Sequence, residues 1–317
     1  MPLDPQARQL LQVMAESGTP PLHQLTPAEA RQAHAEQTPA LAGAGPKVGA
    51  VTDERIATNA GDLQVRIYRP SGLGPFPVLV YLHGGGWVVG TLDTYDALCR
   101  HLTVRADCLT VSVAYRLAPE HRHPAALEDA YAATCWSQDH AAFFAGDPGR
   151  LGVAGDSAGG HLAGLVAARA ADHRAPQLSF QVLLYPALDP TMRSESVTEF
   201  AEGYYLSREE LCWCWNHYLG PEDDWDLSEV SPLHRSDLRG LPRTLLIVAG
   251  HDPLRDEGVL YAKRLESAGV PTLLRNYHGM IHGFVRFLRR FDTAHDAIRE
   301  VATFVRKATD RRVEVGT

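Results

Sequence analysis

One serine of the chain stands between glycines, at a point where an apolar run gives way to a helical segment. The stretch GDSAGG covers residues 155–160 and holds the chain's single G-x-S-x-G pattern, with Gly155, Ser157 and Gly159. It follows RLGVAG and opens AGGHLAGLVAARAA. Strand before and helix after are the context of a nucleophile elbow, whose tight turn admits only small flanking residues. The competing interpretation is a glycine-rich turn with an incidental serine.

A serine hydroxyl is a weak nucleophile, so it needs a base that a third group orients. In an elbow of this kind, the acid and then the base follow the serine along the chain. The apolar run TLLIVAG, residues 244–250, is followed by Asp252. The next run, TLLRNY, covers residues 272–277, and we expect His278 and His282 in the loop after it. Ser157, Asp252 and His282 thus occur in the required order, each after a different strand.

Two of these three positions have competitors. Asp256 and Glu257 lie shortly after Asp252, at the start of an expected helix, where acids commonly interact with the helix dipole. His278 competes with His282 for the role of the base. Chain order alone does not decide between the two histidines.

The glycine run HGGGW, residues 83–87, follows the apolar strand PVLVYL, residues 77–82. Attack of a serine on an ester carbonyl places negative charge on oxygen, and losing one preorganised N–H donor to it costs on the order of 10²–10³ in rate. One donor is the amide after the nucleophile, here Ala158, and the others come from a glycine loop. A phosphate loop is the rival interpretation, but the chain lacks the motifs of such loops.

The elements that would position these residues alternate along the chain. A hairpin is expected over residues 55–70, where apolar and polar residues alternate around a turn. Later apolar runs alternate with helical segments, which is typical of a mostly parallel sheet covered on both faces, an α/β fold. A final amphipathic helix carries Ala294, Ile298, Val301 and Val305 on one face. The expected strands are 77–82, 109–115, 150–155, 181–186, 244–250 and 272–277, and the helices between them include 128–140, 158–171 and 257–269.

Two regions do not fit the alternation, and we expect them to form a helical cap over the sheet. Residues 26–37 read as a helix with a capping box of Thr26 and Glu29. Residues 187–231 show no strand pattern but contain an aromatic-rich helix, which Ser207 and Glu210 can cap. The predicted division is residues 1–50 and 190–231 for the cap, and residues 51–189 and 232–317 for the catalytic core.

Composition excludes several classes of function. The formal net charge of −8 and the pI near 6.0 argue against a nucleic-acid partner, which usually binds a basic face. No apolar run approaches the roughly 18 residues of a membrane helix. No secretion signal is visible at the start, and the odd number of cysteines argues against a disulfide framework, so we expect a cytoplasmic protein.

No metal or other cofactor is predicted. Cys212 and Cys214 form an isolated C-x-C pair among aromatics, whereas zinc usually takes four ligands at characteristic spacings. His121 and His123 lie close together, but no third ligand is spaced to join them. We therefore expect structural burial of these cysteines, and His161 on the elbow helix is expected to pack in the same way.

The motifs taken together resemble those of a known family. Over about residues 55–308, the chain resembles the hormone-sensitive-lipase-like esterases, the bacterial family IV, of the α/β-hydrolase fold. His123 departs from the family pattern, which usually has an aromatic residue there. The motifs that carry the resemblance are, in the family's order, HGGGW (83–87), YRLAPEHRHPAALEDA (115–130), GDSAGG (155–160), YPALD (185–189), SPL (231–233), DPLRDEG (252–258) and HGF (282–284).

The resemblance implies specific roles for the matching residues. It makes Ser157 the nucleophile, Asp252 the acid and His282 the base, and so favours Asp252 over Asp256 and His282 over His278. It implies that the oxyanion donors are Ala158 and two of the three residues Gly84, Gly85 and Gly86. Two further residues would be structural: Asp156 would brace the elbow and His83 would hold the glycine loop by hydrogen bonding.

Family members mostly hydrolyse short-chain acyl esters without a cofactor, and many dimerise, so a small-molecule ester substrate and a homodimer are expected. The alternatives are an amidase or a lactonase with the same triad, and a non-catalytic binding protein on the same fold. Trp87 would either pack against the glycine loop or form a wall of the substrate pocket. Ordinary burial competes with a pocket role for the other aromatic candidates, which are Tyr185, Tyr204, Tyr205, Trp213 and Trp215.

Overall fold

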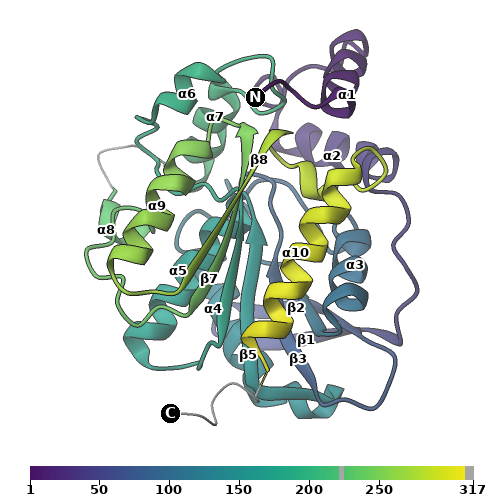
Figure 1. Cartoon of the computed structure of the whole chain (residues 1–317), viewed down its shortest axis with the longest axis vertical. Helices are drawn as coiled ribbons and strands as arrows, with labels where there is room; N and C mark the ends of the chain where they lie inside the picture. Colours follow the sequence, from purple (N-terminus) through teal and green to yellow (C-terminus); the bar gives the residue numbers. More distant parts are fainter. Residues whose placement is uncertain (221–224, 311–317) are drawn as a thin grey trace.

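The apolar runs of the sequence form one central sheet in the computed structural model, which describes residues 1–220 and 225–310 (Figure 1). Within these ranges, eight strands pair in the order β1-β2-β4-β3-β5-β6-β7-β8. The pairs β1–β2 and β2–β4 are antiparallel, and all other pairs are parallel. The strands are β1 Ala50–Thr58, β2 Gly61–Arg69, β3 Phe76–Leu82, β4 Leu109–Val113, β5 Gly146–Asp156, β6 Phe180–Leu184, β7 Arg243–His251 and β8 Thr272–Ile281.

The predicted strands are confirmed, with different limits. β3 and β4 are buried along their whole length, because helices cover both faces of a parallel sheet. One difference affects the site: β8 continues to Ile281, where a loop was expected from residue 278. His278 therefore lies within a strand, and His282 is the first residue after it. The prediction that both histidines lie in one loop was wrong for His278.

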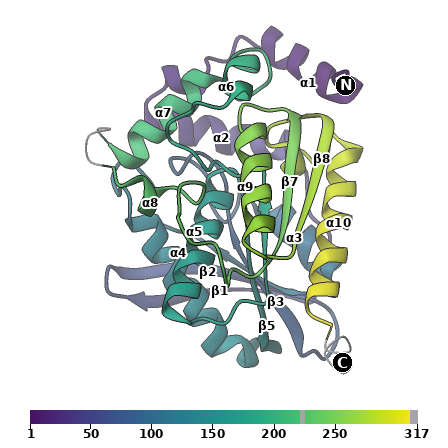
Figure 2. The same cartoon turned by 60° about the vertical axis from the view of Figure 1, so that its left-hand side comes forward.

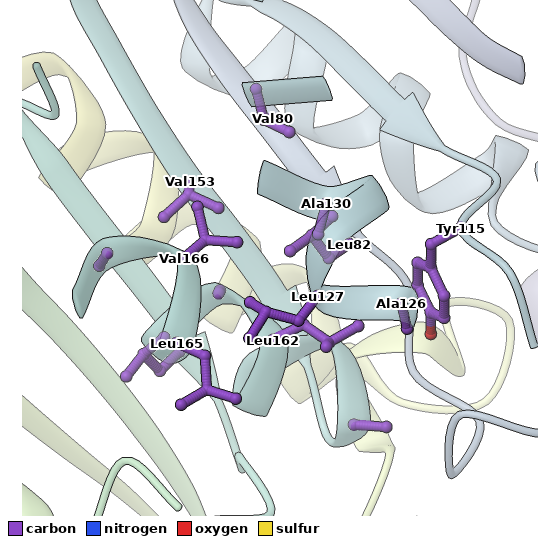
Figure 3. Packing of buried hydrophobic residues seen from close by; sticks show 14 of the residues in the cluster. Val80, Leu82, Tyr115, Ala126, Leu127, Ala130, Val153, Leu162, Leu165 and Val166 are labelled. Carbon is purple, nitrogen blue, oxygen red and sulfur yellow. The ribbon is translucent and has the colours of Figure 1, made fainter. Parts of the chain in front are cut away.

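Helices cover the two faces of the sheet, and side chains of successive strand residues alternate between them. Val80 and Leu82 of β3 belong to the core with α4, α5 and α9, whereas Leu79 and Tyr81 belong to the core with α3 and α10. Figure 3 shows the first core, in which Leu162 and Val166 lie among side chains of β3, β5 and α4. These helices are α3 Asp96–Ala106, α4 Ala125–His140, α5 Ala158–His173, α9 Arg255–Ser267 and α10 Asp292–Ala308.

Four helices lie beyond one end of the sheet, at the top of Figures 1 and 2: α1 Pro5–Glu16, α2 Pro27–Ala42, α6 Glu195–Glu199 and α7 Arg208–Leu219. Both predicted capping boxes are present, at the start of α2 and of α7. In the described parts of residues 187–231, helices α6, α7 and α8 (Leu227–Val230) are found and no strand. The division into cap and core stays a prediction, and residues 221–224 and 311–317 of its ranges lie outside the described residues.

All five cysteines are free thiols, two of them only partly buried. No helix in the described part of the chain combines the length and the apolar character that a membrane crossing requires.

Candidate active site

Ser157 lies in a strained turn between β5 and α5. Its φ of 54° and ψ of −119° are unfavourable for a residue with a side chain, and such strain gathers at functional sites. Two backbone hydrogen bonds hold the turn: the Ser157 amide donates to Leu184 over 2.8 Å, and the His161 amide donates to Ser157 over 3.0 Å. A Cβ at Gly155 would collide with the carbonyl of Gly159, and one at Gly159 with the carbonyl of Leu82. The G-x-S-x-G pattern is therefore a packing requirement of the elbow.

The structure brings Ser157, His282 and Asp252 together. The His282 Nε2 lies 2.9 Å from the Ser157 Oγ, and the His282 Nδ1 lies 2.8 Å from the Asp252 Oδ2. Asp252 is fully buried, and its Oδ1 accepts a hydrogen bond from the Leu254 amide. Because a carboxylate only accepts, the Nδ1 of His282 carries the proton, which leaves Nε2 free to accept the serine proton. This is the geometry of a nucleophile, a base and an orienting acid.

The residues that competed for the roles of base and acid have other surroundings. His278 is exposed on β8. Asp256 accepts hydrogen bonds from the Ser196 amide and from the Arg255 side chain, and Glu257 is buried and accepts from the Leu188 amide. These two acids thus hold the segment that follows β6, a tertiary role that the helix-dipole interpretation did not include.

The glycine loop is fixed to the elbow by Asp156. The Gly84 amide donates to the Asp156 Oδ1 over 2.9 Å, and the hydroxyls of Tyr81 and Tyr95 donate to the same carboxylate. Burial raises the pKa of Asp156, although Arg286 and the three donors act in the opposite direction. Asp156 therefore braces the loop against the elbow.

This bond narrows the choice of oxyanion donors, which were expected at two of the three glycines 84–86. The Gly84 amide is already used by Asp156, so it is not available to a substrate oxygen. Within the described chain, the amides of Gly85, Gly86 and Ala158 donate to no protein acceptor, and all three residues line one cavity with Ser157. Gly85 and Gly86 have φ values of 110° and 58°, which side chains rarely adopt. Ala158 begins α5, whose N-terminal dipole also favours negative charge.

His83 holds the loop from the other side, as expected. A carbonyl only accepts, so the His83 Nδ1 donates to the Gly84 carbonyl, over 2.8 Å. The Tyr115 hydroxyl donates to the His83 carbonyl over 2.6 Å, and the two rings stack. Burial lowers the pKa of His83 to about 4, so the imidazole is neutral at neutral pH.

Comparisons with known proteins agree with this geometry. Residues 79–286 match the family model of the alpha/beta hydrolase fold. The carboxylic ester hydrolase LipN of Mycobacterium tuberculosis is 45% identical over 77% of this chain and 67% of its own length. The ethyl acetate hydrolase of Pseudomonas putida is 39% identical over 84% of this chain and 85% of its own. The solved structure of the ester-hydrolase EH1AB1, from the metagenome of Lake Arreo, has a TM-score of 0.91 at 41% identity and covers 96% of this chain and 98% of its own.

The chain belongs to the hormone-sensitive-lipase-like esterases of the α/β-hydrolase fold. Its reaction class is carboxylic ester hydrolysis. The fold class and the enzyme class expected from the sequence are therefore confirmed.

Trp87 of the esterase has both roles that the sequence left open. Its ring stacks on Tyr218 at 4.4 Å between centroids and lies 4.2 Å from Trp215, both on α7. His161 of the elbow helix meets the same ring edge-on at 5.1 Å. Trp87 also lines the cavity above Ser157. It thus joins the glycine loop, the elbow helix and α7 while forming part of the pocket wall.

The cavity has a volume of about 710 Å³ and contains Ser157 and His282 in its wall. Of the aromatic candidates, Trp87 and Tyr205 line it. Tyr185, Tyr204, Trp213 and Trp215 do not: Tyr185 packs edge-on against the His282 ring, and Trp215 is buried behind Trp87. Seven leucines also line the cavity, and they are Leu10, Leu11, Leu22, Leu25, Leu41, Leu206 and Leu211.

Sequence reasoning missed four polar side chains near the site. Tyr81 and Tyr95 hold Asp156, while His34 of α2 and Arg286 line the cavity. Arg286 had a visible signal, because it lies four residues after His282 in an otherwise apolar stretch, HGFVRF. The other three belong to segments whose contacts depend on tertiary packing.

A pH-dependent stability follows from His161. The residue is fully buried, its Nε2 donates to the Val230 carbonyl over 2.7 Å, and burial lowers its pKa to about 3. Because the unfolded imidazole takes up a proton near pH 6.5, stability falls as pH drops below that value, by up to about 1.4 kcal/mol per pH unit. We expect the slope of the unfolding free energy between pH 6.5 and 4 to be smaller in His161→Gln, measured by urea unfolding. An equal slope in both proteins would contradict this account of His161.

Proposed function

We propose that this esterase hydrolyses its substrates with Ser157 as nucleophile, His282 as base and Asp252 as the orienting acid. The observation that supports this most is the chain of two hydrogen bonds, 2.9 Å and 2.8 Å long, from the Ser157 Oγ through His282 to a fully buried Asp252. His282 takes the serine proton as the Oγ attacks the ester carbonyl. The amides of Gly85, Gly86 and Ala158 then donate to the oxyanion that forms.

The reaction proceeds through an acyl-enzyme. Collapse of the tetrahedral intermediate breaks the bond to the alcohol, which leaves with the proton held by His282. A water molecule then gives its proton to the same imidazole and attacks the acyl carbonyl. The acid is released, and the serine recovers its proton. The negative charge of Asp252 stabilises the imidazolium in both steps, and no cofactor is needed.

Short- to medium-chain acyl esters are the proposed substrates. The curated relative that is 39% identical is an ethyl acetate hydrolase, a name that denotes a small ester. The cavity of about 710 Å³ is lined mainly by aliphatic side chains of the cap and suits ligands of moderate size. A homodimer and a cytoplasmic location stay predictions from the sequence.

The triad proposal is tested by two substitutions. We expect Ser157→Ala to lower kcat by about 10⁶-fold, because no other group can form the acyl-enzyme. Asp252→Asn should lower kcat by about 10⁴-fold, because an amide favours the wrong tautomer of His282. The assay is hydrolysis of p-nitrophenyl butyrate by the purified proteins, with exposed Ser267→Ala and Asp237→Asn as matched controls. Near-normal activity of folded Ser157→Ala protein would refute the assignment.

The acyl preference is tested by kcat/KM for p-nitrophenyl esters from acetate to palmitate. We expect a maximum at short or medium chains, because the cavity has room for only a limited alkyl length. A maximum at palmitate would contradict the proposal about chain length and leave the triad proposal intact.

A further inference from the structure

Arg286 places a cation in the wall of the substrate cavity. The residue ends the short turn η4, Phe284–Arg286, which begins two residues after His282. It lines the same cavity as Ser157 and is only partly exposed. Its guanidinium interacts electrostatically with Asp156, next to the nucleophile, and with Tyr185, which packs against His282. The charge therefore lies close to the reacting groups.

This guanidinium lacks a protein acceptor. Within the described residues, it forms no ion pair and donates no hydrogen bond. Its contacts are with ring faces: the Cζ lies 5.6 Å from the centre of the Tyr95 ring and 5.4 Å from that of Phe287. A half-buried cation without an acceptor is costly unless a ligand supplies one, and cation–π contacts offset only part of that cost.

Asp156 does not fill this need. Its Oδ1 already accepts from Tyr81 and Gly84, and its Oδ2 accepts from Tyr95. The Tyr95 ring that binds Asp156 through its hydroxyl also carries Arg286 on its face. Asp156 and Arg286 thus share Tyr95 but form no direct hydrogen bond.

His34 of α2 supplies a second unused polar group in the same cavity. Its Nε2 is buried and has no hydrogen-bond partner in the described chain, and His34 lines the cavity. His34 and Arg286 line the same cavity, and the positive charge of Arg286 helps to lower the pKa of His34. The cap and the loop after His282 therefore each contribute an unpaired nitrogen to this part of the pocket.

The remaining charges of the cavity do not pair with Arg286. Glu210 accepts hydrogen bonds from the Leu22 and Ser207 amides. Glu202, Glu209 and Arg290 are exposed. The cavity thus combines an apolar wall and a catalytic serine with a partly buried cation, Arg286, that has no counter-charge in hydrogen-bond contact among the described residues.

We propose that Arg286, with His34 beside it, forms an anion subsite that binds a carboxylate of the substrate, so that the esterase favours esters carrying a second, ionised carboxyl group. The planar guanidinium matches a carboxylate through two parallel hydrogen bonds, and the imidazole offers one more. The carboxylate belongs either to the acid part, as in a half-ester of a dicarboxylic acid, or to the alcohol part. This inference rests on the proposed function, because it assumes that Ser157 attacks an ester held in this cavity.

Binding without turnover tests the subsite independently of catalysis. Ser157→Ala protein is titrated calorimetrically with two matched pairs of esters, each pair differing by a carboxylate in place of a methyl group. Monoethyl glutarate against ethyl pentanoate tests the acid part, and 3-butanoyloxypropanoate against propyl butanoate tests the alcohol part. We expect about 10-fold or greater preference for the charged member of one pair, lost when Arg286→Met is added. Equal binding within both pairs would overturn the proposal.

Kinetics with the otherwise native enzyme separate the subsite from a structural role. The measured quantity is the ratio of kcat/KM for the charged ester to that for its neutral partner, followed by proton release in a pH-stat. We expect Arg286→Met to lower this ratio by about 10–100-fold and Arg286→Lys, which keeps the charge, to lower it less. Arg289→Met removes an exposed charge outside the cavity wall and serves as the control.

The outcomes are distinct for the two proposals. If Arg286→Met lowers both kcat/KM values equally, Arg286 supports Asp156 and the elbow, and the subsite is refuted. The subsite is also refuted if the ratio of kcat/KM for the charged ester to that for the neutral ester is the same in the wild-type enzyme and in Arg286→Met. A different experiment would refute the proposed function: undiminished hydrolysis of p-nitrophenyl butyrate by Ser157→Ala protein.

Discussion

The hydrogen bond from the Gly84 amide to Asp156 is the constraint on which the catalytic geometry depends. It ties the loop after β3 to the turn after β5, two segments 72 residues apart in the chain. Ser157 is the next residue after Asp156, and Gly85 and Gly86 follow Gly84. One carboxylate therefore sets the nucleophile and the proposed oxyanion donors in a common frame. Such preorganisation matters because donors already in place need no reorganisation during reaction.

Asp156 is held by groups of several elements. Tyr81 comes from β3 and Tyr95 from the start of α3, and both direct their hydroxyls at the carboxylate. His83 and Tyr115 secure the same loop from its other side. The aromatic contacts of Trp87 with Trp215 and Tyr218 join this loop to α7, since both partners lie on that helix. The helix α7 is thereby held against the glycine loop.

The elbow, the order of the catalytic residues and the alternating elements could be predicted because each depends on local sequence. The small residue at 155 follows from a collision with the nearby Gly159 carbonyl, although the one at 159 also depends on the Leu82 carbonyl of β3. The capping boxes of α2 and α7 are local hydrogen bonds. The use of the Gly84 amide could not be predicted, because it depends on where Asp156 lies in three dimensions. The motif also does not show which of Gly84, Gly85 and Gly86 donate to the oxyanion, because the three are identical residues in one run.

Which of the aromatic candidates line the cavity could not be predicted from the sequence either. None of Tyr185, Tyr204, Trp213 and Trp215 lines the cavity. Trp215 packs on Trp87 and Tyr185 on His282, while Trp213 contacts His217 and Tyr204 contacts His251. The lining comes instead from aliphatic residues of α1 and α2, whose packing over the sheet is set by tertiary contacts. Arg286 could be seen in the sequence as a charge four residues after His282, but its lack of an acceptor is a property of the folded chain.

The central claim is that Ser157 is the group that forms the covalent intermediate, and mass spectrometry after reaction with diethyl p-nitrophenyl phosphate tests it most directly. Attack of the activated serine on phosphorus displaces p-nitrophenolate and leaves a stable diethylphosphoryl ester. The account predicts one such group per chain, located on Ser157, with loss of esterase activity in proportion to labelling. Inactivation with the label on another residue, or full activity of protein labelled at Ser157, would contradict it.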